Sequence, residues 1–124
     1  MTFWTRRNWL TLAALIGLLS VAVGAFAAHG AQLKAAELLH TAATYAFMHA
    51  MAMVASAVLM QLGAKRARLA PAWFFAGVLL FSGSLIALAF GAPRMIGLIT
   101  PFGGVSFLIG WGILAWAARG VDRP

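Results

Sequence analysis

The sequence predicts an all-α membrane protein: a bundle of four transmembrane helices with both termini in the cytoplasm. Of its 124 residues, 64% are hydrophobic and 9% are charged, against roughly 25% charged in an average soluble domain. A chain this short buries less than roughly 70% of its surface on folding, so it could not hide that many apolar side chains from water. Four nearly uncharged stretches each exceed the roughly 18–20 residues that cross a hydrocarbon core about 30 Å thick. Lipid offers no hydrogen-bond partners for backbone N–H and C=O groups, so each stretch is expected to be a helix, in which these groups bond to one another.

The first expected helix covers residues 8–28 and follows two basic residues, Arg6 and Arg7. An alternative is a cleaved export signal, because "TRRNWL" (residues 5–10) resembles a twin-arginine motif and Ala25-Phe26-Ala27 an A-x-A cleavage site. The apolar run exceeds the roughly 7–15 residues of a signal-peptide core. We therefore interpret the segment as a helix that stays in the protein.

The other three helices are expected at residues 38–63, 71–91 and 101–118, so residues 1–124 form a single domain. Pro71 suits a first helical turn, where its missing N–H does no harm. Thr100 and Pro101 are typical of an N-cap followed by the first helical position. "MIGLI" (residues 95–99) is then left as apolar, irregular chain that should fold back onto the bundle, with Gly103 and Gly104 making room for it.

Small residues are expected to bring the helices together, because lipid provides no hydrophobic drive for helix association. Four pairs have the small-x3-small spacing, for example Ser20 with Gly24 and Ser106 with Gly110. The glycines expected at helix contacts are Gly17, Gly24, Gly83, Gly103, Gly104 and Gly110.

The basic residues predict the orientation of the bundle. Seven of the nine lie before the first helix, between the second and third, or after the fourth: Arg6, Arg7, Lys65, Arg66, Arg68, Arg119 and Arg123. Only Lys34 and Arg94 lie in the other two connections. Since short cytoplasmic loops carry an excess of Lys and Arg, both termini are expected in the cytoplasm.

A stripe of polar residues runs along the second expected helix. Glu37, Thr41, Tyr45 and His49 are four residues apart, and His40 and Thr44 lie beside them. Polar groups at membrane depth are costly without partners, so we expect the stripe to face the bundle and to form one polar cluster near the non-cytoplasmic face. The expected partners on the other helices are His29, Ser82, Ser84 and the Thr100–Gly104 turn, with Ser106 a further candidate.

The main interpretation of this cluster is interhelical hydrogen bonding. A proton or solute path is an alternative, because ionisable groups inside membranes often mark such routes. Haem ligation by two histidines and a zinc site made of His29, Glu37 and His40 have weaker support, because no haem-attachment motif or zinc-ligand spacing is present. The chain has no cysteine. No metal, no cofactor and no enzymatic activity are predicted.

Five motifs occur in an order that resembles a known family: "GAFAAHG" (24–30), "TYAFMHAMAM" (44–53), "FSGSL" (81–85), "ITPFGG" (99–104) and "GW" (110–111). The sequence resembles the domain of unknown function 423 family, which contains YgdD-like and transmembrane protein 256-like small membrane proteins. Two positions depart from the family pattern, Ala27 in place of a glycine and Ile86 in place of an aromatic residue. The resemblance covers residues 10–117 and implies a four-helix membrane protein with no established reaction, cofactor or catalytic residue.

These observations predict a multi-pass protein of the bacterial inner membrane, with the lipid bilayer as its surroundings. The small size and the absence of a soluble domain favour a non-enzymatic structural or accessory subunit, in a homo-oligomer or a larger membrane complex. The alternative is a channel or transporter for protons or a small solute that uses the internal polar cluster. Nucleic acid is not an expected partner, because the basic residues are dispersed and serve as topology signals.

Overall fold

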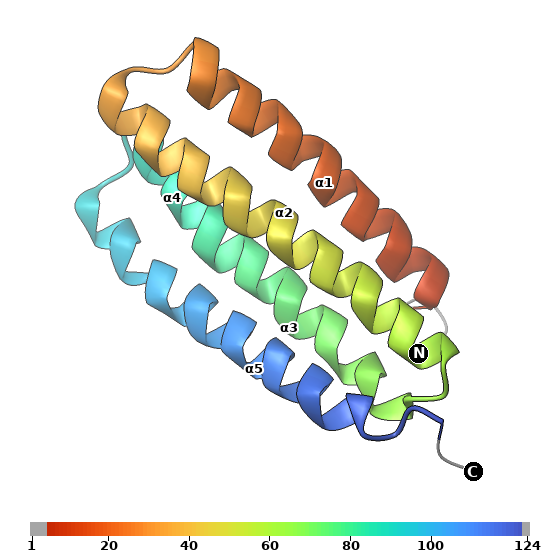
Figure 1. Cartoon of the computed structure of the whole chain (residues 1–124). Coiled ribbons are helices and arrows are strands. Elements are labelled where there is room, and N and C mark those ends of the chain that lie inside the picture. Colours follow the sequence, from red (N-terminus) through yellow and green to blue (C-terminus); the bar gives the residue numbers. More distant parts are fainter. Residues whose placement is uncertain (1–4, 123–124) are drawn as a thin grey trace.

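The structure, a computed structural model, describes residues 5–122, and every regular element in that range is helical. Four helical stretches are long and apolar enough to cross a membrane: Arg6–His29, Leu33–Gln61, Lys65–Ala89 and Arg94–Ala118. They lie roughly side by side in chain order (Figure 1). Arg123, one of the basic residues used to predict the orientation, lies outside the described residues.

Helices α1 (Arg6–His29) and α2 (Leu33–Gln61) form a hairpin. The hydroxyl of Thr5 caps α1 by accepting a hydrogen bond from the amide of Asn8 at 3.3 Å. Helix α2 begins five residues before the expected residue 38. The charges of Lys34 and Glu37 mark where the apolar run starts, but they do not interrupt the helix, because both residue types are good helix formers.

The third span consists of four helical pieces, where the sequence predicts one helix over residues 71–91. A 3₁₀ turn, η1 (Lys65–Leu69), leads into α3 (Ala70–Gly77); a π-helical turn, η2 (Val78–Ser82), then joins α3 to α4 (Gly83–Ala89). In the π turn the amide of Gly83 bonds to the carbonyl of Val78, five residues earlier. Gly63 and Gly91, with φ of 97° and 99°, provide the left-handed backbone that precedes and ends this span.

The fourth span begins with a 3₁₀ turn, η3 (Arg94–Leu98), followed by α5 (Thr100–Ala118). The expectation of irregular chain at residues 95–99 is wrong, whereas the expected packing on the bundle is confirmed in part, since the turn contacts α4 and a Cβ on Gly97 would lie 3.6 Å from Leu88. The segment is helical, and the side chains of Met95 and Leu98 are 69% and 71% exposed. Its amides bond within the turn, as Ile96 does to the carbonyl of Pro93 at 3.0 Å, so the backbone needs no cover from the bundle.

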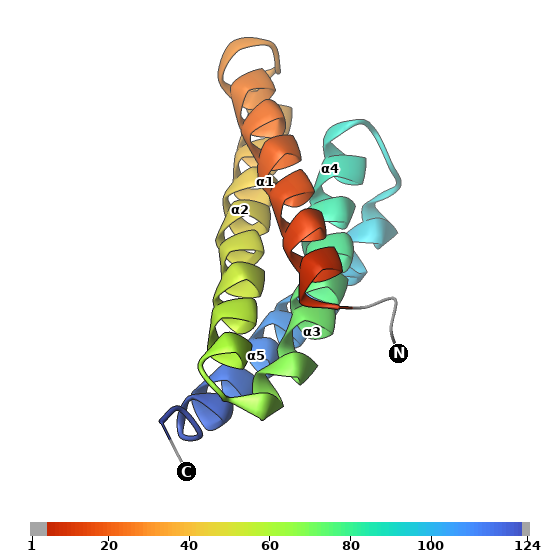
Figure 2. The ribbon, with the colours of Figure 1, turned by 90° about the vertical axis from the view of Figure 1, so that its right-hand side faces the viewer.

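Each span packs mainly on its neighbours in the chain. Helix α1 packs on α2, α2 packs on the third span, and α5 packs on α3 and the π turn. Figures 1 and 2 show the start of α1 and the end of α5 at the same end of the bundle, together with the turn between α2 and α3. This common end carries the described basic residues Arg6, Arg7, Lys65, Arg66, Arg68 and Arg119.

Only some of the glycines expected at helix contacts occupy such positions. A Cβ on Gly110 would lie 2.6–2.9 Å from ring atoms of Phe74, and one on Gly103 would meet the backbone of Phe81. Gly24 faces the Cβ of Ala43 at 3.7 Å, an ordinary contact. Three other glycines make no close helix contact within the described residues, because a Cβ would have nothing within 4 Å at Gly17, Gly83 or Gly104.

The predicted orientation can be tested by labelling single cysteines, since the chain has none of its own. A cysteine at exposed Gln32 should react with a membrane-impermeant maleimide added to intact cells. One at Leu62, 52% exposed at the basic end, should react only after the membrane is opened. Ala67 is unsuitable because it is fully buried. Labelling of Leu62→Cys but not of Gln32→Cys in intact cells would show that the orientation is the opposite of the predicted one.

Candidate functional site

His49 is the buried ionisable side chain at the centre of the bundle. It lies on α2, sixteen residues or about 24 Å from the start of that helix at Leu33, and its side chain is 3% exposed. A polar group at this depth must have partners, because lipid supplies none. The hydrogen bonds and ring contacts of His49 therefore decide which chemical role the middle of the bundle can have.

Both ring nitrogens of His49 are hydrogen-bonded. Nδ1 lies 2.7 Å from the carbonyl oxygen of Tyr45, one turn earlier on α2, and Nε2 lies 3.1 Å from the indole Nε1 of Trp111 on α5. A carbonyl oxygen can only accept and an indole N–H can only donate. The proton must therefore be on Nδ1, and the ring is a neutral imidazole that accepts from Trp111 and joins α2 to α5.

Aromatic rings surround this histidine. The ring of Phe107 stacks on it, with centroids 3.5 Å apart and planes 8° apart. Phe74 of α3 approaches with a centroid distance of 5.8 Å, and Tyr45 with one of 6.1 Å. We call His49, Tyr45, Phe74, Phe107 and Trp111 the His49 cluster. Its residues come from the second, third and fourth spans, so the cluster connects these three spans.

Two glycines make the crossing that forms this cluster possible. Gly110, directly before Trp111, lies against the ring of Phe74, and Gly77 lies against the ring of Phe107. A side chain at either position would overlap an aromatic ring, so α3 and α5 could not approach as closely. The small and aromatic residues thus alternate across the α3–α5 contact.

Three further polar contacts tie helices together. The hydroxyl of Ser82 donates to the carbonyl of Ala42 on α2 at 2.7 Å, and that of Ser106 donates to the carbonyl of Trp73 at 2.6 Å. Ser84 donates to the carbonyl of Phe81 at 2.9 Å, which leaves its oxygen to accept from the hydroxyl of Thr100 at 2.5 Å. Ser82, Ser84, Thr100 and Ser106 therefore bond between spans, but in separate pairs.

The single polar cluster expected near the non-cytoplasmic face does not form. His49 and Tyr45 contact aromatic rings at mid-span, and their hydrogen bonds do not include Ser84 or Thr100, which bond to each other. Four of the other predicted members, His29, Glu37, His40 and Thr44, are exposed, and Thr41 is half-buried. The reason is helical drift: steps of four residues advance 40° each, so Glu37 and His49 lie about 120° apart around α2.

The metal sites considered from the sequence also depend on histidines that lie apart. Within residues 5–122, no three His, Cys, Asp or Glu side chains come together in a way that could hold a metal ion. His49 could ligate haem iron only by giving up a hydrogen bond, because Nδ1 donates to the carbonyl of Tyr45 and Nε2 accepts from Trp111. Chemically, the His49 cluster offers an imidazole with both nitrogens engaged and one phenol, that of the part-exposed Tyr45, with no carboxylate among its residues.

Sequence reasoning missed the partners of His49: Trp111, Phe107 and Phe74. A signal was present in α5, where the buried residues Gly103, Phe107, Gly110 and Leu114 recur every three or four positions. That spacing predicts one contact face and places Trp111 at its edge. It is hard to recognise because α5 is apolar on all sides.

Comparison with known proteins gives a consistent set of relatives. The model of the family described as "Protein of unknown function (DUF423)" matches residues 23–104, which is 82 of the 124 residues. A "UPF0382 membrane protein" of Haemophilus influenzae is 45% identical over 117 residues, covering 91% of this chain and 94% of the relative.

Two further relatives come from other bacteria. The "UPF0382 inner membrane protein YgdD" of Escherichia coli K12 is 38% identical and covers 96% of this chain and 95% of its own. The "UPF0382 membrane protein YwdK" of Bacillus subtilis is 37% identical and covers 89% of this chain and 94% of its own. No solved structure matches the chain.

Proposed function

Since the chain belongs to the DUF423 family of membrane proteins of unknown function, we propose that it acts as a non-enzymatic subunit of a membrane assembly. The protein is a multi-pass membrane protein with four helical spans. The bacterial inner membrane is its proposed location, as it is in the printed name of the Escherichia coli relative.

The interior of the bundle supports a role without catalysis. Among the described residues, no buried side-chain nitrogen or oxygen lacks a hydrogen-bond partner. The buried serines and His49 all bond to the chain itself, so none of them is held ready for a substrate. Enzyme sites usually gather reactive groups in an open pocket. Here the polar groups are used to hold the spans together.

The observation that carries the proposal lies on the outside of the α1–α2 hairpin. His40 and Thr44 are exposed on α2 and line a shallow pocket whose α1 side includes Gly24 and Ala28. Thr44 is eleven residues, or about 16 Å, from the start of α2 and about 9 Å past the start of the uncharged run at Leu38. Polar side chains that face lipid at such a depth are costly. A partner helix that accepts their hydrogen bonds would remove this cost, and the small residues would let it approach.

Site-specific photocrosslinking in native membranes tests this proposal. A photoreactive side chain at Thr44 should give an adduct with the mass of a second protein, either another copy of this chain or a different subunit. The same side chain at Leu108, 71% exposed on α5, serves as the control and should label lipid only. Lipid adducts alone from both positions would contradict the proposal. Replacing His40 and Thr44 by leucine should abolish the adduct formed from a photoreactive group at Ala28.

The alternative, a channel for protons or a small solute, receives less support from the geometry. A conducting path requires polar groups that follow one another through the membrane. The polar pairs of the bundle are separate, and both nitrogens of His49 are engaged. The test is proton flux in reconstituted vesicles, where equal flux with wild-type protein and with empty vesicles would eliminate this alternative.

A further inference from the structure

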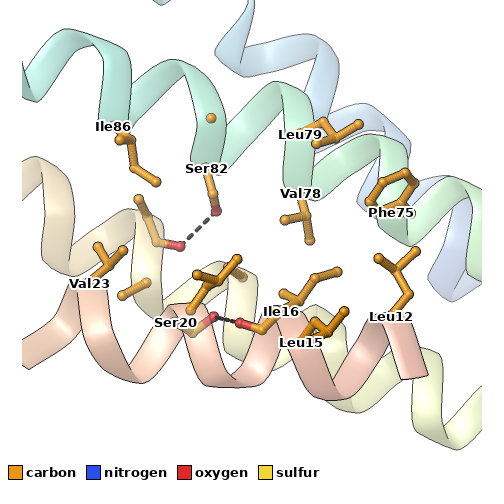
Figure 3. Close-up of a pocket in the computed structure, with 15 residues that line it drawn as sticks. Leu12, Leu15, Ile16, Ser20, Val23, Phe75, Val78, Leu79, Ser82 and Ile86 are labelled. Carbon is orange, nitrogen blue, oxygen red and sulfur yellow. Dashed lines mark hydrogen bonds between the residues drawn. The ribbon is translucent and has the colours of Figure 1, made fainter. Parts of the chain in front are cut away.

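An apolar groove runs between α1 and the third span. Its walls come from α1 and from residues 75–86, and its floor consists of the alanines Ala42, Ala43 and Ala46 of α2. Figure 3 shows Leu12 and Ile16 of α1 facing Phe75 and Val78 of the third span across it. The groove exists because α1 packs mainly on α2 and not on the third span. Its volume is about 350 Å³.

The lining of the groove is hydrocarbon along its whole length. Ser20 and Ser82 belong to the lining, but their hydroxyls donate to the carbonyls of Ile16 and Ala42 at 2.7 Å each (Figure 3). The ligand that fits such a surface is an alkyl chain, which gains dispersion contacts and needs no hydrogen bonds.

At its basic end the groove continues into a second pocket of about 490 Å³. Phe75 lines both pockets, and Arg6 and Arg68 stand on opposite sides of the second one, on α1 and η1. Neither of the two acidic residues of the chain, Glu37 and Asp122, lines it. Arg6 donates one hydrogen bond to the side-chain oxygen of Gln61 and Arg68 donates one to the carbonyl of Lys65, so each guanidinium keeps further donors. The guanidinium of Arg66 lies over the ring of Trp116 at 4.3 Å. The mouth of the groove therefore presents two positive charges that no carboxylate of the pocket lining offsets.

The length of the groove is close to the thickness of one leaflet. From Leu12 to Val23 the α1 wall rises about 16 Å, and half of a hydrocarbon core is about 15 Å. The groove is centred on the middle of α1, so an acyl chain that enters from the basic end reaches past the middle of the span.

We infer that the protein binds an anionic glycerophospholipid between α1 and the third span, with an acyl chain in the groove and the phosphate between Arg6 and Arg68. The lipid belongs to the leaflet next to the basic end of the bundle. Its acyl chain joins α1 to the third span, which α1 otherwise meets only slightly.

Native mass spectrometry of the purified full chain with dioleoyl phosphatidylglycerol or dioleoyl phosphatidylcholine tests the inference. Wild type should retain one phosphatidylglycerol in preference to phosphatidylcholine. Arg6→Gln and Arg68→Gln should each weaken phosphatidylglycerol binding by roughly fivefold, the scale of one basic residue beside an anionic lipid surface. Arg7→Gln is the matched control, because Arg7 lies at the same end but, unlike Arg6, does not line the pocket that would hold the phosphate. An equal loss with Arg7→Gln would overturn the proposed headgroup site.

Filling the groove tests the acyl-chain site. Gly83 lines the groove and has nothing within 4 Å of the position of a Cβ, so Gly83→Phe should fit and should abolish retention of both lipids. Leu79→Trp fills the same groove from an exposed position and replaces it if Gly83→Phe does not fold. Gly112→Phe on α5, equally open, is the control and should bind like wild type. Unchanged lipid retention by the filled variants, or competition by free glycerol phosphate, would overturn the inference.

Discussion

Replacing Gly103 by alanine should lower the free energy of unfolding by about 1–3 kcal/mol, the range measured for overpacked cores. The new Cβ would lie 2.8 Å from the Cα and 2.7 Å from the Cβ of Phe81. These atoms belong to the π turn of the third span, so they cannot turn aside as the end of a flexible side chain can. Helix α5 would have to move away from η2, and reversible unfolding in mixed micelles with increasing dodecyl sulfate measures the cost.

Gly104 provides a matched control for this substitution. It is the next residue on α5, and a Cβ there would have nothing within 4 Å. Gly104→Ala should leave the stability unchanged or raise it by up to about 1 kcal/mol, because alanine is the better helix former. The same change at adjacent positions is thus expected to have opposite signs. Equal effects of the two variants would show that the α5 crossing is not tight at Gly103.

His49→Ala should lower the free energy of unfolding by about 2–4 kcal/mol. The variant loses the stack on Phe107, the contact with Phe74 and the hydrogen bond from Trp111, and it leaves a cavity in the middle of three spans. Unfolding in the same micelles measures it, with Met48→Ala as the control, because Met48 is 44% exposed on the same helix. A loss below about 0.5 kcal/mol would mean that the cluster contributes little.

A second substitution separates the hydrogen bond from the packing. His49→Phe keeps an aromatic ring but removes the acceptor for Trp111, so it should cost only about 0.6–1.7 kcal/mol, the scale of interhelical hydrogen bonds in membranes. The double variant His49→Phe with Trp111→Phe should lose less stability than the two single variants lose together, because each single variant already removes the same hydrogen bond. Additive costs would show that the two side chains are not coupled.

The four spans could be predicted from the sequence because an isolated segment in lipid can satisfy its backbone hydrogen bonds only as a helix. Any uncharged stretch of sufficient length must satisfy its amides internally, and hydropathy alone finds it. Hydropathy does not find the ends of helices, which is why α2 starts at Leu33 before its charged residues. It also does not find the π turn, since Val78–Ser82 is as apolar and as helix-compatible as its surroundings.

The packing could be predicted only in part, because the outer faces of these helices are as apolar as their inner faces. Gly103 and Gly104 are indistinguishable in sequence, and only the neighbouring helix decides which one needs to lack a side chain. His49 was identified by the cost of burying a polar group, a local property. Its partner Trp111 lies 62 residues away on another span, and no local rule connects them.

The π turn decides where the third span can lose a residue. Such a turn holds one residue more than an α-helical turn, so deleting any residue of 78–82 would leave a regular helix of almost the same hydropathy. Because the turn already holds this extra residue within one turn, the residues after the deletion would keep nearly the same direction relative to α3. Ser84 would still face Thr100, and Phe74 and Gly77 would keep their places. A deletion within α3 or α4 would instead rotate everything after it by about 100°. The π turn is thus a place where the third span can lose one residue without turning its later side chains away from their partners.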